Sequence, residues 1–165
     1  MSAFVVDTNV PVVANGRSEQ ADPDCVIACV TVLGDVLTDG TIVLDDGMRI
    51  LKEYMGNLSM SGQPGAGDLF MKWVWNVHAD ENRCERVHLT CEDAGSDNFN
   101  EFPGDADLTD FDRSDRKFVA VALTSRNRPV VLNAVDSDWA DSHVALKRNG
   151  VKVRFLCPQC VSPLE

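Results

Sequence analysis

The 165-residue chain lacks a long hydrophobic run, and none of its apolar stretches approaches the roughly 20 residues of a membrane-spanning helix. Its N-terminus also lacks the charged and apolar regions of a secretion signal. Because nothing in the sequence indicates an oxidising compartment, we expect a soluble, cytoplasmic protein whose six cysteines are reduced thiols. The sequence shows no internal repeat. Its length suits one domain with a proper core over residues 1–160, followed by a short tail at 161–165.

Basic residues are scarce: the chain has 15 Lys and Arg against 26 Asp and Glu, and its net charge is −11. At face value this charge argues against a nucleic-acid partner. The acidity is concentrated, however, in residues 91–112, which contain no Lys or Arg and carry Glu92, Asp93, Asp97, Glu101, Asp105, Asp107, Asp110 and Asp112. The remainder of the chain is near neutral, so a phosphate-binding face is not excluded. We interpret residues 91–112 as an acidic loop within the domain, and whether it is disordered, gates a cationic site or is simply solvated stays open.

Short β-branched runs alternate with amphipathic stretches along the chain. We expect strands at about 3–6, 41–44, 83–90, 130–132 and 151–156. Helices are expected at about 23–39, 48–58, 69–79, 115–124 and 139–149, with Asp22, Asp68 and Ser114 as N-caps of three of them. This alternation predicts an α/β fold with a doubly wound parallel sheet and right-handed crossovers.

Several carboxylates follow the predicted strands or lie on the predicted helices. Asp7 directly follows the first strand, Glu53 lies on the helix after the second, Asp115 starts a helix, and Asp136 and Asp138 follow the fourth strand. Each has a plain structural explanation alone, as a turn residue, a solvated helix residue or a partner of the helix dipole. In an open parallel sheet, however, ligands bind at the carboxyl ends of the strands. Several carboxylates at one end of one sheet therefore favour a functional site.

Four motifs cover nearly the whole chain: FVVDTNV, ILKEY, SDRKFVAVAL and VVLNAVDSDW. In order and spacing they resemble the PIN domain, the metal-dependent nuclease fold of many toxin–antitoxin toxins and RNA-processing enzymes. The resemblance implies a three-layer fold with a five-stranded parallel sheet in the order 3-2-1-4-5, which places Asp7 beside Asp136 at the switch point. Two features depart from the family. Ala134 stands where the family often has Thr or Ser, and the acidic loop is not a general family feature.

The resemblance implies hydrolysis of phosphodiester bonds with Mg²⁺ or Mn²⁺ held by carboxylate oxygens. Single-stranded or structured RNA is favoured as the substrate, and DNA stays open. The role would be toxin-like, defensive or RNA-processing. The catalytic residues implied are Asp7, Glu53, Asp115 and Asp136, and the metal ligands are Asp7, Asp115, Asp136 and Asp138. Asn9 would orient Asp7. The phosphate contacts expected are Arg113, Arg116 and Lys117.

Other functions were weighed against this hypothesis. A catalytically silent PIN-like module that binds a protein or RNA stays open, because of Ala134 and the low basic content. An inhibitory protein partner and a homodimer also stay open. A haloacid-dehalogenase phosphatase needs a second Asp where Asn9 stands, and a response-regulator receiver needs one at the end of the third strand, where the sequence reads His88-Leu89-Thr90.

The cysteines allow a further alternative. Cys157 and Cys160 form a CxxC pair, which supplies half of a tetrahedral zinc site. Cys84 and Cys91 flank the third strand, which the proposed strand order places at the edge opposite the fifth. Cys25 and Cys29 lie on the apolar side of a predicted helix and are interpreted as core residues. We therefore favour free thiols over a zinc site.

Overall fold

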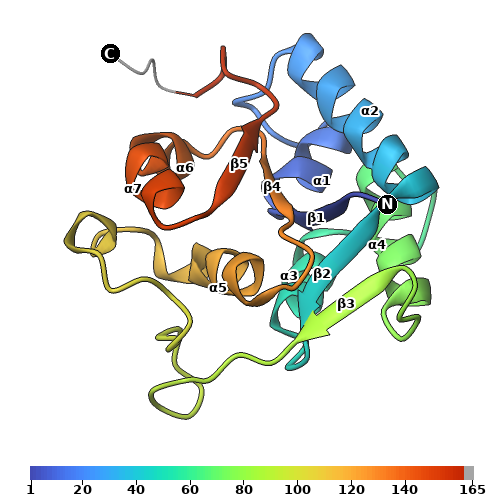
Figure 1. Ribbon diagram of the computed structural model, residues 1–165. Coiled ribbons are helices and arrows are strands. Elements are labelled where there is room, and N and C mark those ends of the chain that lie inside the picture. Colours follow the sequence, from blue (N-terminus) through green and yellow to red (C-terminus); the bar gives the residue numbers. More distant parts are fainter. Residues whose placement is uncertain (162–165) are drawn as a thin grey trace.

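Five parallel strands form one sheet in the computed structural model, which describes residues 1–161 (Figure 1). The strands are β1 (Ala3–Val6), β2 (Thr41–Asp45), β3 (Cys84–Val87), β4 (Val130–Asn133) and β5 (Lys152–Phe155). Their order across the sheet is β3-β2-β1-β4-β5, as predicted. β1 is central, with Phe4 opposite Ile42 on one side and Val130 on the other. The predicted α/β fold and strand order are thus confirmed.

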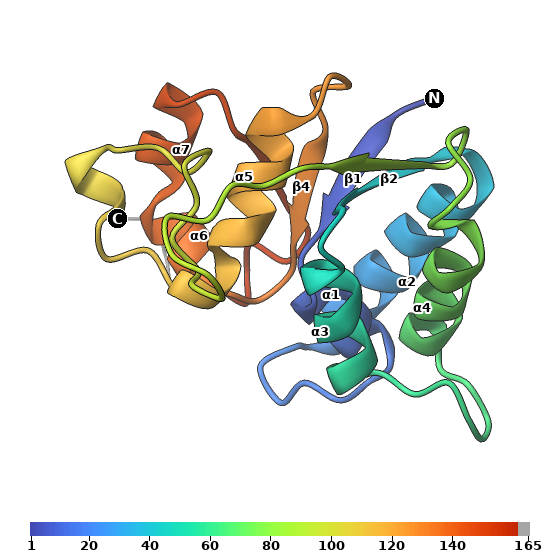
Figure 2. The same ribbon diagram turned by 90° about the horizontal axis from the view of Figure 1, so that it is seen from below.

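Helices cover both faces of the sheet (Figure 2). One face carries α1 (Asn9–Ala14), α2 (Pro23–Asp39), α3 (Arg49–Asn57) and α4 (Ala66–Val77). The other carries α5 (Arg116–Thr124), α6 (Ser137–Asp141) and α7 (His143–Arg148). Two short 3₁₀ turns, η1 (Ala106–Leu108) and η2 (Arg113–Asp115), precede α5. Apolar side chains of β1, β2 and β4 are buried between the two helical layers, as a parallel sheet requires.

The helix boundaries test the predicted caps. Asp22 caps α2 as expected, since its carboxylate accepts the Cys25 N–H at 2.8 Å and Pro23 is the first helical residue. Asp68 was wrongly predicted as an N-cap: α4 begins earlier, after Gly65, and Asp68 accepts the Gly65 N–H at 3.0 Å from inside the first turn. Ser114 was also wrong, because η2 occupies that position and α5 starts after Asp115.

Two parts of the helical pattern were not predicted. α1 is only six residues long, which is too short for a periodic signal, and it tolerates Pro11 because first-turn N–H groups have no partner within the helix. The expected helix over 139–149 is instead two helices that meet at Ser142. α1 packs closely on α4, where a side chain on Gly67 would overlap the Pro11 carbonyl oxygen.

The acidic segment, residues 91–112, is packed onto the domain. Phe99, Leu108 and Phe111 are buried, and the Phe111 ring meets the Trp139 ring edge-on with centroids 5.1 Å apart. Arg148 on α7 pairs with two of the segment's carboxylates, one of them that of Asp105 at 2.6 Å. Apart from η1 and an antiparallel bridge between Cys91 and Phe99, the segment is irregular. Because of these buried side chains and ion pairs, residues 91–112 are neither a disordered loop nor a simply solvated one.

The cysteines differ from the expectation. Cys25 and Cys157 form a disulfide across 132 residues of sequence, which corrects the prediction of reduced thiols throughout. Cys29, Cys84, Cys91 and Cys160 are free. Among residues 1–161, no helix has the length and apolar character needed to cross a membrane. Val161 is buried, and the remainder of the expected tail, 162–165, lies outside the described residues.

Candidate metal centre

Asp7 is positioned by the strand that precedes it. Its backbone N–H continues the ladder from β1 to β4 by donating to the Leu132 carbonyl at 3.1 Å, and the side chain is buried at the end of the strand. The Asn9 N–H donates to Oδ1 at 3.0 Å, and the Trp139 indole N–H donates to Oδ2 at 2.8 Å. Both carboxylate oxygens of Asp7 are therefore held in place by N–H donors.

Asp115 and Asp136 meet Asp7 at this edge of the sheet. One carboxylate oxygen from each of the three residues lies within 4.8 Å of the other two. The convergence follows from the topology, since β4 lies beside β1 and η2 brings Asp115 to the start of α5. Asp136 caps α6 by accepting the Asp138 N–H at 2.9 Å. Oxygen donors from three separate elements thus surround one point.

Asp138 belongs to a second group instead. Its carboxylate lies within 4.8 Å of oxygens of Asp112 and Asp115, so Asp115 is common to both groups. Sequence reasoning counted Asp112 only as part of the acidic segment. The available signal was its position three residues before Asp115, because residues at that spacing share one side of a helical turn.

Glu53 lies near the centre but is engaged elsewhere. Its Oε1 accepts the Lys117 ammonium at 2.8 Å, and its Oε2 accepts the Thr8 hydroxyl. Lys117 also donates to the Ser114 carbonyl. Glu53 belongs to neither of the two groups of carboxylates described above. The sequence did not predict Thr8 or the pairing with Lys117, because helix spacing does not reveal contacts between elements distant in the chain.

Burial and mutual repulsion make the carboxylates unfavourable as free anions. Burial raises the pKa of Asp7 to about 7; the N–H donors from Asn9 and Trp139 oppose this rise, and the charge of Asp136 adds to it. Burial raises the pKa of Asp115 to about 9, with the charge of Asp7 and the contact with Asp136 adding to the rise. A cation bound between these oxygens would compensate their charge.

The side chain of Asn9 forms hydrogen bonds with the end of β4 rather than with Asp7. Its Nδ2 donates to Asn133 Oδ1 and its Oδ1 accepts the Ala134 N–H, both at 2.8 Å. Only its backbone N–H touches Asp7. Asn9 therefore fixes the β1 and β4 ends together, and Ala134 is held by its backbone without a side-chain hydroxyl.

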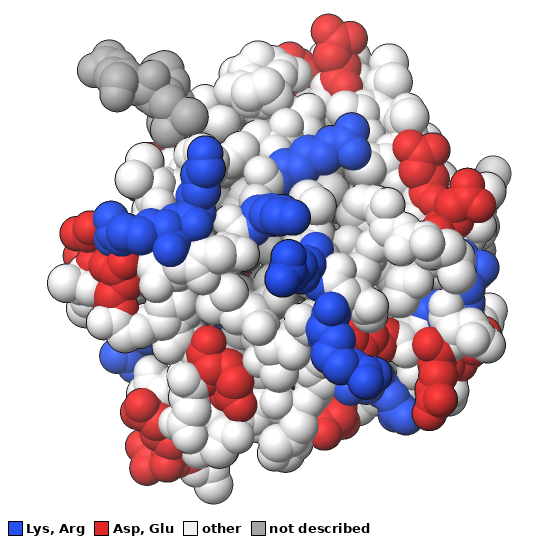
Figure 3. Space-filling model, viewed as in Figure 1, with Lys and Arg blue, Asp and Glu red and all other residues white. Residues whose placement is uncertain are grey.

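The three expected phosphate contacts have different surroundings. Lys117 is buried in the pair with Glu53, and the Arg116 guanidinium lies 4.7 Å from the centre of the Phe102 ring. Arg113 alone of the three is exposed. Figure 3 shows other Lys and Arg side chains crossing the face where the strands begin, which is the end of the sheet opposite Asp7. Of the three expected contacts, Arg113 is therefore the one whose charge is accessible to a phosphate.

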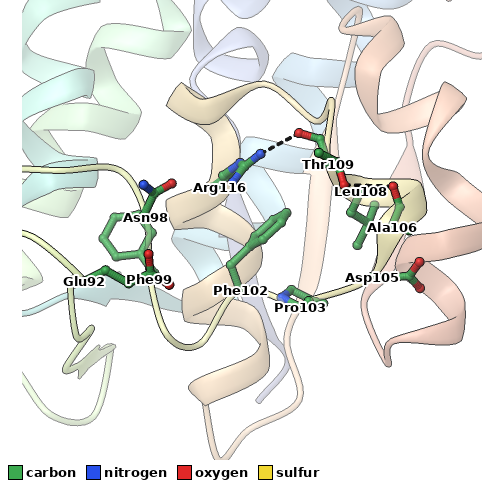
Figure 4. A pocket seen from close by; sticks show the side chains of 11 residues that line it. Glu92, Asn98, Phe99, Phe102, Pro103, Asp105, Ala106, Leu108, Thr109 and Arg116 are labelled. Carbon is green, nitrogen blue, oxygen red and sulfur yellow. Dashed lines mark hydrogen bonds between the residues drawn. The ribbon is translucent and has the colours of Figure 1, made fainter.

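A pocket of about 400 Å³ lies between the acidic segment and α5. Figure 4 shows the Phe102 ring beside Arg116, whose guanidinium donates to the Thr109 carbonyl at 2.9 Å. Phe99 and Asp105 form other parts of the wall. Because Arg116 directly follows Asp115, the pocket adjoins the helix start that carries a metal-centre carboxylate.

Trp139 is a further residue of the centre that sequence reasoning overlooked. It was expected only as the first residue of the last helix, and it is fully buried. A buried Trp usually finds an acceptor for its N–H, and Trp139 follows Asp136 by three residues. That combination was the available indication of a contact with the site.

Comparison with known proteins identifies no relative. No protein-family model matches the chain, and no curated protein and no solved structure matches it.

Proposed function

We propose that this protein is a metal-dependent nuclease that hydrolyses phosphodiester bonds in RNA, in a toxin-like, defensive or RNA-processing role. The observation that carries the proposal is the convergence of Asp7, Asp115 and Asp136 within 4.8 Å at the carboxyl ends of neighbouring parallel strands. The resemblance of its four motifs to the PIN domain supports the same function. Fold alone would not, since one fold serves many activities.

The donor set fits Mg²⁺ or Mn²⁺. All donors are carboxylate oxygens, which these hard cations prefer over nitrogen or sulfur. A bound divalent ion supplies Lewis acidity and activates a water as the attacking group. Because each oxygen of Asp7 accepts only one N–H bond, each retains a lone pair for a cation.

The chain's own residues have separable roles in this proposal. Asp7, Asp115 and Asp136 hold the ion, and Asp138 with Asp112 extends the donor set next to Asp115. The Trp139 N–H holds one oxygen of Asp7 in place. Arg113 offers positive charge to a backbone phosphate of the RNA.

Glu53 gives a specific reason to retain a second candidate function. The Lys117 ammonium occupies one of its oxygens and the Thr8 hydroxyl occupies the other, so Glu53 can act as a base only if this pair opens. In a module that binds RNA or a protein without cleavage, Glu53 would stay paired with Lys117 and Thr8 at all times. Ala134, where the PIN family often has a hydroxyl residue, favours the same alternative.

Cleavage of labelled single-stranded RNA and DNA in Mn²⁺, Mg²⁺ or EDTA separates the candidates. We expect metal-dependent cleavage, faster on RNA, by the wild type and by the exposed control Asp97→Asn. Asp7→Asn should lose more than about 100-fold, because loss of a ligand exceeds the 10–100-fold effect of its supporting contacts. RNA binding by the wild type without cleavage in either metal would contradict the nuclease and support the silent module.

A further inference from the structure

A group of cysteines from opposite ends of the chain lies outside the carboxylate centre. Cys25 and Cys29 are one turn apart on α2, and Cys157 and Cys160 follow β5. The sulfur atoms of Cys25, Cys29 and Cys157 all lie within 4.8 Å of one another, and these three side chains are fully buried. The Cys25–Cys157 disulfide therefore has a third sulfur beside it.

Cys160 adds a fourth sulfur, which follows Cys157 by three residues and lies outside the group of three. The Cys160 N–H donates to the Cys157 carbonyl at 2.9 Å, which closes a turn over the CxxC sequence. Burial raises the pKa of the Cys29 thiol to about 12, and the charge of Cys160 adds to the rise. The Gln159 amide donates to the Asp22 carboxylate at 3.2 Å and ties the turn to the start of α2.

This arrangement matches the requirements of zinc better than those of a disulfide alone. A disulfide uses two of the four sulfurs and leaves two thiols next to it. A tetrahedral site with Zn–S distances of about 2.3 Å places its sulfurs roughly 3.8 Å apart. The sulfurs of Cys25, Cys29 and Cys157 already lie within 4.8 Å of one another. Soft thiolates also select a different metal from the carboxylates of the other site.

The other two cysteines cannot complete such a site. Cys84 lies on β3, at the opposite edge of the sheet from β5, and Cys91 follows it. The strand order expected from the sequence already counted against them as partners for Cys157 and Cys160. The partners in the structure are instead the two helix residues that apolar periodicity had assigned to the core.

We propose that, once the Cys25–Cys157 bond is reduced, the thiolates of Cys25, Cys29, Cys157 and Cys160 bind one Zn²⁺ that fastens the segment after β5 to the start of α2. A dithiol reductant supplies two electrons and two protons, which convert the disulfide into two thiols while the reductant becomes a disulfide. Zn²⁺ then displaces one proton from each of the four thiols. With four protein ligands the site is closed, so its role is structural.

The test uses the full chain, reduced with a phosphine that does not compete for zinc, loaded with Zn²⁺ and dialysed against metal-free buffer. Native mass spectrometry should find one Zn²⁺ per wild-type chain. Cys160→Ser and Cys29→Ser should each weaken zinc binding more than about 100-fold, whereas Cys84→Ser and Cys91→Ser should bind like the wild type. Asp7→Asn should also retain its zinc, which separates this site from the proposed nuclease centre.

Cobalt provides a readout that needs no variant. Co²⁺ bound to the reduced wild type should give the intense ligand-field bands of a tetrahedral site together with thiolate charge-transfer absorption. A zinc-free reduced wild type, or a Co²⁺ spectrum without thiolate absorption, would overturn the proposal. So would equal zinc affinity in Cys160→Ser and the wild type.

Discussion

Replacing Asp7 by Asn removes one negative charge from a buried cluster and leaves the size of the side chain unchanged. The pKa of Asp7 is raised from 3.8 to about 7, so the ionised side chain costs the metal-free fold about 4 kcal/mol at pH 8. The Asn amide can accept one of the two N–H bonds that Asp7 now accepts, and the lost bond costs about 1–3 kcal/mol. The balance is a gain in unfolding free energy of about 2 kcal/mol.

The pH dependence of this gain has a definite sign. A carboxyl whose pKa is raised on folding contributes its stability below pH 3.8 and loses it as the pH rises through 7. The wild type in EDTA should therefore lose stability from pH 4 to pH 8, and Asp7→Asn should lose less. The gain from Asp7→Asn should vanish at pH 5, where the ionisation cost falls to the size of the lost hydrogen bond.

Thermal unfolding followed by circular dichroism measures these effects. For a chain of this length, 2 kcal/mol corresponds to a rise in Tm of about 4–8 °C for Asp7→Asn in EDTA at pH 8. Mn²⁺ at 100 times its Kd should add about 2.7 kcal/mol to the wild type and less to Asp7→Asn. The exposed control Asp97→Asn should follow the wild type throughout.

Two results would refute this reasoning. Equal Mn²⁺ shifts for the wild type and Asp7→Asn would show that Asp7 is not a ligand. A difference in Tm that is the same at pH 5 and pH 8 would show that ionisation of the buried carboxyl is not what strains the metal-free fold.

Three further substitutions test neighbouring contacts. Trp139→Phe keeps an aromatic ring but removes the indole N–H donor of the site, and we expect Mn²⁺ affinity in a calorimetric titration to fall about 10–100-fold with the fold intact. Lys117→Met leaves Glu53 without its cation; because Glu53 is partly exposed, we expect a loss of about 2–3 kcal/mol in urea unfolding, which Glu53→Gln in the same chain should largely restore. Hydrogen bonds from Arg148 lower the pKa of Asp105 to about 2, and Arg148→Met should return this pKa toward 3.8 in an NMR titration. The ion pair stabilises the fold above pH 3.8 and loses this effect as the pH falls through 2, so the variant should lack that pH-dependent stability. An unchanged carboxyl titration would contradict the ion pair.

Much of the fold could be predicted because it depends on patterns local in the sequence. Buried β-branched runs mark the strands, and the pair Asp22-Pro23 marks the start of α2. The meeting of Asp7 and Asp136 followed from strand order, since parallel strands at neighbouring positions end at the same edge. In these cases short-range chemistry and global topology agree.

The features that were missed depend on contacts between distant segments. Helical spacing placed Cys25 on the apolar side of α2 but gave no indication that Cys157 would reach it. The start of α4 was misplaced because Gly65 offers no side-chain cap, whereas Asp68 looks like one. The contact between Trp139 and Asp7 spans 132 positions and depends on how α6 returns to the sheet.

The packing of the acidic segment has a practical consequence for anyone who modifies this chain. Phe111 seals one side of Trp139, whose N–H in turn holds Asp7. Shortening the segment through Phe99 or Phe111 would remove part of the core, so it cannot be trimmed like an ordinary surface insertion. Its tip is different, because Asp93 and Asp97 are exposed and the turn at Gly95 bears no packing. An affinity tag or a fluorophore belongs at that tip, where it would report on the segment without displacing the aromatic contacts that support the carboxylates.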